Sequence, residues 1–158
     1  MIIDGFLVFD GTISTNGLAG VNQFASGATT TSTNTIDLLN ARDLGDGGDS
    51  LSGNLTISFL ITTAYAGGTS VNFQLQGSTD NVTWTTYSET GAIAIASLTA
   101  GTRLALKMPS VNPDAGPPPR YLRTAYVNVG ANTAGAVIAY LNSPDDNRYY
   151  KPGIVISN

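Results

Sequence analysis

Aspartate side chains are the main candidates for chemistry in this sequence, because it contains no His and no Cys. Three of them, Asp43, Asp46 and Asp49, share a Gly-rich stretch. Carboxylate oxygens on a flexible backbone are typical Ca²⁺ ligands. The spacing differs from that of an EF-hand loop, however, and no acidic residue closes the stretch. A solvated turn is therefore the favoured interpretation, and we expect no metal site.

Catalysis by this chain is not expected. The absence of His removes the usual general base, and the absence of Cys removes thiolate chemistry. An enzyme would depend on a pair such as Asp145 and Asp146, but adjacent side chains usually point apart. A catalytic site needs several convergent groups. We therefore predict a protein that is not an enzyme and that has no catalytic residue and no cofactor.

The remaining candidates are aromatic and basic side chains that suit binding. Trp84, with Tyr87 nearby, would serve as a sugar-stacking platform if it were exposed, but alternation with Val82 favours a core position. Arg120 and Arg123 bracket a tyrosine and a leucine, and Arg and Tyr are frequent at protein interfaces. The two arginines are therefore candidate partner-binding residues. Their odd separation predicts opposite faces of a strand.

The charge distribution excludes two classes of partner. Charged residues make up 11% of the chain and the net charge is −4, with seven scattered basic residues. Without a basic stripe, nucleic acid is not an expected partner. No apolar run approaches the roughly 18 residues of a membrane span, and the first residues do not resemble a signal peptide. We expect a soluble protein made in a cytoplasm, with no membrane partner.

Alternating hydrophobicity predicts the elements that would position these residues. Leu55, Ile57, Phe59 and Ile61 should share one face of a strand, and Val71, Phe73 and Leu75 one face of the next. Val82 and Trp84 are expected to continue the inward pattern after a hairpin loop at residues 77–81. Further strands are predicted at Ile2–Phe9, Thr33–Leu39, Ala92–Ala96, Arg103–Met108, Tyr121–Val129 and Ala136–Leu141.

About eight short strands at regular spacing predict an all-β fold, a jelly roll or antiparallel β-sandwich, made of a single domain over residues 1–158. Residues 11–32 are rich in Gly, Ser, Thr and Asn, and they are predicted to form a long loop or arm. Residues 143–158 are predicted to form a C-terminal extension.

The C-terminal extension is unusually apolar for a tail. Tyr149 and Tyr150 could anchor it on a neighbour, and Ile154 to Ile156 could add as a strand to a sheet edge. An equally open alternative is that the tail folds back as a final strand of its own sandwich. The candidate partner-binding residues are thus Arg120, Arg123, Tyr149, Tyr150, Ile154 and Ile156.

Several segments, in order along most of the chain, resemble the small jelly-roll cement, or decoration, proteins of tailed bacteriophages. They are Met1–Asp4 with Leu7–Phe9, Thr62–Val71, Gln74–Trp84, Pro119–Arg123 and Thr133–Ala136. The order and spacing carry the likeness, since no single segment is diagnostic. Residues 11–32 and Pro117–Pro119 are longer than the pattern of that family.

The resemblance implies a non-enzymatic structural protein of the virion, bound to the outer capsid surface. It implies the major capsid protein as partner, and self-association as a homodimer. The competing hypothesis is a carbohydrate-binding or tail-associated β module, which would need exposed aromatic side chains in a groove.

Overall fold

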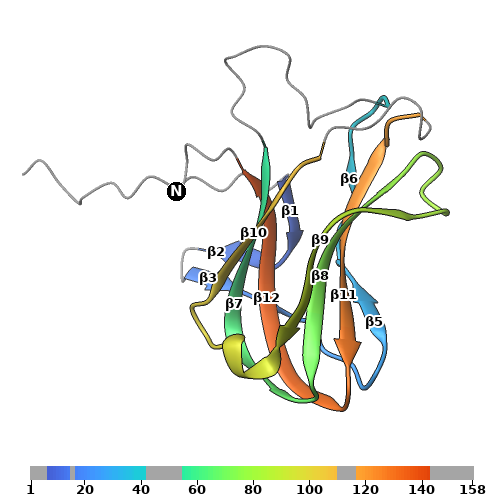
Figure 1. Ribbon diagram of the computed structural model, residues 1–158. Helices are drawn as coiled ribbons and strands as arrows, with labels where there is room; N and C mark the ends of the chain where they lie inside the picture. Colours follow the sequence, from blue (N-terminus) through green and yellow to red (C-terminus); the bar gives the residue numbers. More distant parts are fainter. Residues whose placement is uncertain (1–6, 15–16, 42–54, 110–116, 143–158) are drawn as a thin grey trace, which may run out of the picture.

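The computed structural model describes residues 7–14, 17–41, 55–109 and 117–142. These residues form short strands at the N-terminal end and longer strands after residue 55 (Figure 1). A 3-10 helix at Ile95–Ser97 follows β9. The strands are β1 (Val8–Asp10), β2 (Thr12–Ser14), β3 (Gly17–Ala19), β4 (Val21–Asn22), β5 (Thr29–Thr31), β6 (Ile36–Asp37), β7 (Thr56–Gly67), β8 (Ser70–Ser78), β9 (Thr85–Ala94), β10 (Arg103–Lys107), β11 (Tyr121–Val129) and β12 (Asn132–Asn142).

Two antiparallel sheets pack face to face (Figure 1). Sheet one has the order β1-β12-β7-β10, and β4 pairs with β12 beyond the end of β1. Sheet two has the order β5-β11-β8-β9, and β6 pairs with β11 beyond β5. If β1 with β4, and β5 with β6, each count as one position, there are eight positions. They switch sheets at every step except from β8 to β9, which are neighbours in sheet two, and this is the order of a jelly roll. The predicted fold class is therefore confirmed.

The core forms where the inner faces of β7, β8 and β11 meet. Ile57, Phe59 and Ile61 on β7 are at most 1% exposed, as are Val71, Phe73 and Leu75 on β8. The Phe73 ring lies edge-on to Phe59, with 5.3 Å between ring centroids. It also contacts Tyr126 of β11 edge-on, at 5.6 Å. The predicted alternation of these two strands is confirmed, and each buried side chain stabilises the fold by about 1.5–3 kcal/mol.

The alternation predicted beyond β8 is wrong. Val82 is 79% exposed, and Trp84 is half-buried outside the core. Residues 79–83 form a tight turn in which Asn81 has φ 61°, so the period of two is interrupted before β9 begins at Thr85. The strand predicted at Ala92–Ala96 instead ends β9 at Ala94 and passes into the 3-10 helix.

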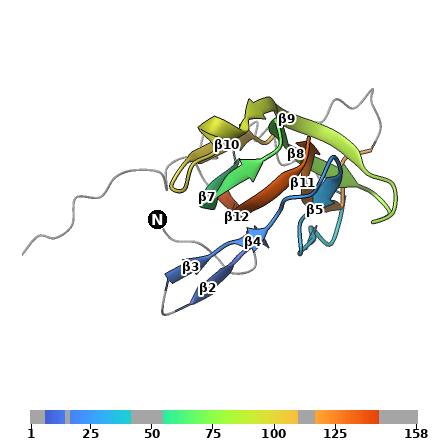
Figure 2. The same ribbon diagram turned by 90° about the horizontal axis from the view of Figure 1, so that it is seen from below.

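Residues 11–32, predicted as a long loop or arm, contain β2 to β5. β2 and β3 form a hairpin of their own, which lies outside the packed sheets in Figure 2. β4 and β5 extend the edges of the two sheets. Thr, Asn and Gly in this stretch suit short edge strands, because one neighbouring strand already satisfies half of the backbone groups.

A buried carboxyl group, Asp10, connects the N-terminal strand to both sheets. Between Val8 and Asp10 a β-bulge shifts the register against β12, and Asp10 is thereby fully buried. Its Oδ2 accepts a hydrogen bond of 2.6 Å from the Tyr126 hydroxyl. Its Oδ1 accepts from Gln23 Nε2 at 3.0 Å, and from the backbone N–H and hydroxyl of Thr33 at 2.8 and 3.0 Å. Tyr126, Gln23 and Thr33 lie on separate segments, and all three thus donate hydrogen bonds to one buried carboxyl group.

Two buried tyrosines should lower the free energy of unfolding at high pH. Burial raises the pKa of Tyr65 and Tyr126 above the ordinary value of 10.0, with a further contribution from Asp10. In the unfolded chain these two phenols ionise near pH 10, whereas in the folded protein they keep their protons to a higher pH. The free energy of unfolding is therefore at its full value below pH 10 and falls as the pH rises above it. At pH 11 each should cost about 1.4 kcal/mol of unfolding free energy. We expect urea unfolding to show a loss of about 3 kcal/mol between pH 8 and pH 11.

Tyr126→Phe is the control for this alkaline effect, because it removes one titrating group and leaves Tyr65, and also Tyr87 and Tyr140, whose pKa values are raised too. The variant should lose about 1.4 kcal/mol less than the wild-type protein between the two pH values. Equal stability of the wild-type protein at pH 8 and pH 11 would contradict the assignment.

Candidate functional site

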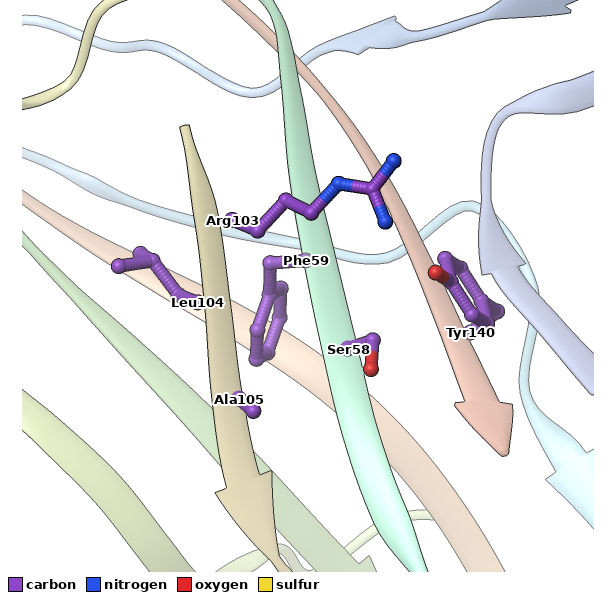
Figure 3. Close-up of a pocket in the computed structure, with 6 residues that line it drawn as sticks. All are labelled: Ser58, Phe59, Arg103, Leu104, Ala105 and Tyr140. Atoms are coloured by element: carbon purple, nitrogen blue, oxygen red, sulfur yellow. The ribbon is translucent and has the colours of Figure 1, made fainter. Parts of the chain in front are cut away.

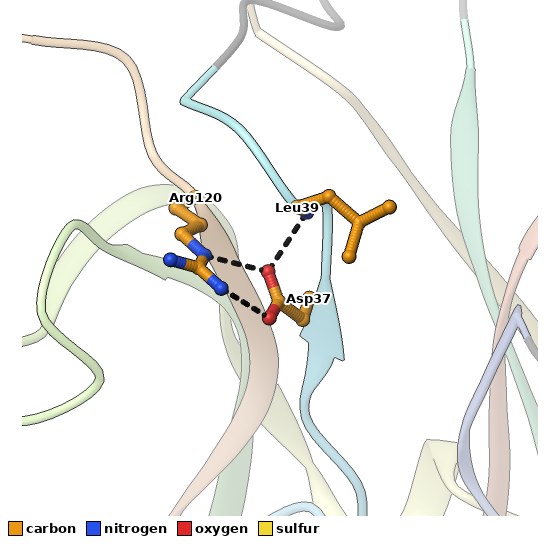
Figure 4. Close-up of polar contacts among 3 residues, drawn as sticks. All are labelled: Asp37, Leu39 and Arg120. Atoms are coloured by element: carbon orange, nitrogen blue, oxygen red, sulfur yellow. Dashed lines mark hydrogen bonds and ion pairs between the residues drawn. The ribbon is translucent and has the colours of Figure 1, made fainter.

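Arg120, one of the predicted binding residues, lies where the chain enters β11. Its Nε and Nη2 atoms donate to Oδ1 and Oδ2 of Asp37 on β6, each at 2.8 Å (Figure 4). The hydrogen bonds from Arg120 lower the pKa of Asp37, which therefore stays ionised through mild acid. This bidentate ion pair links the start of β11 to β6 within the chain.

The backbone of Arg120 also joins two loops at one end of the sandwich. Its N–H donates to the carbonyl of Ser78 at 2.9 Å, and its carbonyl accepts from the N–H of Leu38 at 2.8 Å. Asp37, Tyr121 and Ser78 stand in register across β6, β11 and β8. The loop after β6 and the loop between β8 and β9 thus begin on either side of Arg120, at the upper right of Figure 1.

The loop after β6 contains a solvent-exposed leucine. Leu39 is 74% exposed and has φ 65°, a left-handed conformation that costs a non-glycine residue energy. Its N–H donates to Oδ1 of Asp37 at 2.8 Å, which is the same oxygen that Arg120 Nε contacts (Figure 4). The arginine–aspartate pair therefore maintains the strained turn that displays Leu39.

The β8–β9 loop contains an exposed valine, also on a turn that a carboxylate stabilises. Asp80 Oδ1 accepts from the backbone N–H groups of Val82 and Thr83 at 2.8 and 2.7 Å, and from the Ser78 hydroxyl at 2.8 Å. These bonds, led by the Thr83 N–H, lower the pKa of Asp80. The ionised carboxylate fixes the turn, and Val82 points outward with 79% of its surface exposed.

Leu39, Val82 and the Arg120–Asp37 pair together make up what we call the contact end of the sandwich. Of the described residues, only Leu39 and Asn81 combine a side chain with positive φ, and both belong to its loops. Rigid aliphatic groups within a polar frame are suited to docking on a protein, because little entropy is lost on binding. They offer no group for acid–base or nucleophilic chemistry.

Arg123, the second predicted arginine, lies on the outer face of β11. Its guanidinium carbon lies 4.1 Å from the centroid of the Trp84 ring, and its Nε donates to Gln76 Oε1 at 2.9 Å. Burial lowers the pKa of Arg123. One face of the indole is therefore covered by the chain itself, on the outside of sheet two.

This position predicts a small effect of Trp84→Ala. The variant loses a cation–π contact and a half-buried ring, so the free energy of unfolding should fall by about 1 kcal/mol. Phe73→Ala in the core is the matched comparison and should cost about 3–5 kcal/mol. Urea unfolding of both variants measures the difference, and a loss above about 3 kcal/mol for Trp84→Ala would place the ring in the core after all.

The outer face of sheet one carries a shallow pocket of about 270 Å³. The pocket lies over β10, β7 and β12 (Figure 3). Its charged group is the guanidinium of Arg103, and its hydroxyl groups belong to Ser58 and Tyr140. Phe59, Leu104 and Ala105 complete the lining.

The other sequence-predicted candidates fall outside the described residues. They are Tyr149, Tyr150, Ile154 and Ile156 of the C-terminal extension, the Asp43–Asp49 stretch, and Asp145 with Asp146. Within the described ranges, no group of three or more acidic residues is placed to hold a metal ion. The same ranges contain no helix of the length and hydrophobicity that a membrane crossing requires.

Leu39 and Val82 were missed by reasoning from the sequence. Val82 was assigned inward because alternation was extended through a turn. The hairpin loop that was predicted at residues 77–81 instead occupies residues 79–84, between β8 and β9. Asp80 was the usable signal for this longer loop, because its carboxylate bonds the N–H groups of Val82 and Thr83. Nothing in the sequence around Leu39 distinguishes an exposed leucine from a core one.

The order of the strands in the two sheets defines an antiparallel β-sandwich of the jelly-roll type. Comparison with known families adds that a family model, Bbp16, matches residues 22–141, about three quarters of the chain. The chain belongs to the Bbp16 family. It is a family of phage-type proteins, so the match suggests a phage origin. No curated protein matches the chain.

Proposed function

We propose that this protein is a capsid cement protein of a tailed bacteriophage, a non-enzymatic part of the virion. It would bind the outer surface of the shell and bridge neighbouring copies of the major capsid protein. The phage-type family and the jelly-roll fold support this proposal. So does the resemblance of the sequence to decoration proteins.

The contact end is the observation that carries the proposal. Leu39 and Val82 are exposed by 74% and 79%, and each stands on a turn that a carboxylate holds in place. Buried in a contact, each would contribute about 1.5–3 kcal/mol. Repeated over a lattice, contacts of this size give strong net attachment through multivalency.

Self-association as a homodimer is part of the same proposal. Two linked copies would engage two capsid subunits at once, which raises the effective concentration of the second contact. In this proposal the apolar extension after Asn142 is the segment that joins the two copies.

Co-sedimentation with shells tests the proposed function. Purified protein is mixed with mature shells that lack it, and with unassembled major capsid protein, and the bound fraction is measured from low to high salt. We expect binding to assembled shells that persists in high salt, because apolar contacts are hardly screened. Binding to neither form, or a steep loss at moderate salt, would contradict the proposal.

A carbohydrate-binding or tail-associated module is the second candidate, and one observation favours it. Trp84 lies outside the core, where a sugar-stacking residue would have to be. The guanidinium of Arg123 already covers one face of its ring. A glycan array separates the two candidates: saturable glycan binding that Trp84→Ala abolishes would favour the module, whereas a cement protein should bind no glycan.

A further inference from the structure

The outer face of sheet one has an unusual composition for a surface. Successive strands pair residue for residue there, so side chains line up in rows. One row contains Arg103, Leu60 and Ile138, and the next contains Ala105, Ser58 and Tyr140. Tyr140 is only 2% exposed and Ser58 only 8%, although both lie on the side away from the sandwich core.

The pocket arises because neighbouring side chains in these two rows differ in length. Ala105 is small, and it leaves a hollow beside the long side chain of Arg103. Figure 3 shows that side chain reaching across β7 towards Tyr140, with the Ser58 hydroxyl between the strands. The guanidinium and two hydroxyl groups thus line one hollow of about 270 Å³.

Arg103 has no carboxylate within ion-pair distance among the described residues, where the one salt bridge is that of Arg120 with Asp37. The four acidic residues of these ranges bond elsewhere. Asp10 bonds Tyr126, Asp37 bonds Arg120, Asp80 bonds its own loop and Glu89 bonds Asn72 and Gln74. Within the described residues, the exposed guanidinium of Arg103 is therefore available for an external anion.

The hydroxyl of Tyr140 keeps its proton beside this charge. Burial raises its pKa, which the Arg103 charge and the Ser58 hydrogen bond only partly oppose. The Ser58 hydroxyl donates to Asn142 Oδ1 at 3.1 Å, so both hydroxyl groups already have partners within the sheet. The guanidinium of Arg103 is the group of this hollow that is offered to an anion.

The arrangement suits a carboxylate better than a phosphate. A single guanidinium presents a planar pair of donors that matches the two oxygens of a carboxylate. Among the described residues, the next cation on this face is Lys107, four residues further along β10 and hence about 13 Å away. It is too distant to help Arg103 hold one dianion.

We propose that the pocket binds the side-chain carboxylate of an Asp or Glu on a partner protein, with Arg103 as the anchoring residue. The pocket lies on sheet one, whereas the contact end lies on the loops of sheet two. The proposal is therefore independent of the shell-binding role, and it adds a second and electrostatic contact surface to the molecule.

Titration of the full-length protein followed by NMR tests this site. The probe is N-acetyl-glutamate methylamide, which carries one side-chain carboxylate; its glutamine analogue and inorganic phosphate are the comparison ligands. We expect the glutamate compound to shift the backbone amides of Ser58, Arg103 and Tyr140 in a saturable manner. Arg103→Gln should weaken this binding at least about tenfold.

Lys107→Gln is the matched control, because it removes the same charge from the same face of the same strand outside the pocket. It should change the affinity less than about twofold. Arg103→Lys keeps the charge but not the planar fork, and it should also weaken binding, which provides a test if Arg103→Gln folds poorly.

Three results would overturn the proposal: shifts of equal size with the glutamine analogue, equal losses in Arg103→Gln and Lys107→Gln, or tighter binding of phosphate than of the glutamate compound. No shell takes part in these titrations. A negative result would therefore leave the cement proposal standing.

Discussion

Asp10→Ala should lower the free energy of unfolding by about 3–5 kcal/mol, the largest loss that we expect from any polar substitution. The variant leaves the buried Tyr126 hydroxyl, the Gln23 amide and the Thr33 N–H without their acceptor. Each unsatisfied buried donor costs about 1–3 kcal/mol, which removal of the buried carboxyl only partly offsets. Urea unfolding at neutral pH measures the loss.

Two further variants serve as comparisons for Asp10→Ala. Tyr126→Phe removes one donor and leaves the other bonds of Asp10, so it should cost about 1–2 kcal/mol. Asp80→Ala removes a carboxylate from an exposed loop, where water can replace its hydrogen bonds, so it should cost clearly less than Asp10→Ala. A loss below about 1 kcal/mol for Asp10→Ala would show that water or neighbouring groups replace the carboxyl.

Leu39→Ala and Val82→Ala should each weaken binding to assembled shells by about tenfold to a hundredfold. Each variant removes an aliphatic side chain that stands clear of the surface and is worth about 1.5–3 kcal/mol when buried. Because neither side chain supports the core, the melting temperature should stay within about 2 °C of the wild-type value. Quantitative co-sedimentation over a concentration series gives the affinities.

Val129→Ala is the matched control for these two variants. Val129 is an aliphatic residue that is 47% exposed, but it lies at the opposite end of β11, at the bottom of Figure 1. It should bind shells like the wild-type protein. If it weakens binding as much as Val82→Ala does, the contact end is not the surface that docks.

The sequence predicted the central strands well because their signal is local. From Ile57 to Ile61 on β7 and from Val71 to Leu75 on β8, every second residue is apolar and buried, so a period of two is visible without knowledge of the partner strands. β11 was also predicted with its observed bounds, because the prolines before Arg120 set its start.

The edges and the contact end could not be predicted in this way. Asp37 and Arg120 are 83 residues apart, and their pairing depends on β6 lying beside β11. The left-handed turn at Leu39 follows from that pair, since no local rule places a leucine at positive φ. The burial of Asp10 likewise follows from a bulge against β12, a strand at the other end of the chain.

Electron cryomicroscopy of shells incubated with the purified protein tests the cement proposal most directly. We expect jelly-roll density on the outer surface of the shell, with the loops of Leu39 and Val82 against capsid subunits and each copy bridging neighbours. Shells that remain bare, or density attached only at the tail, would contradict it.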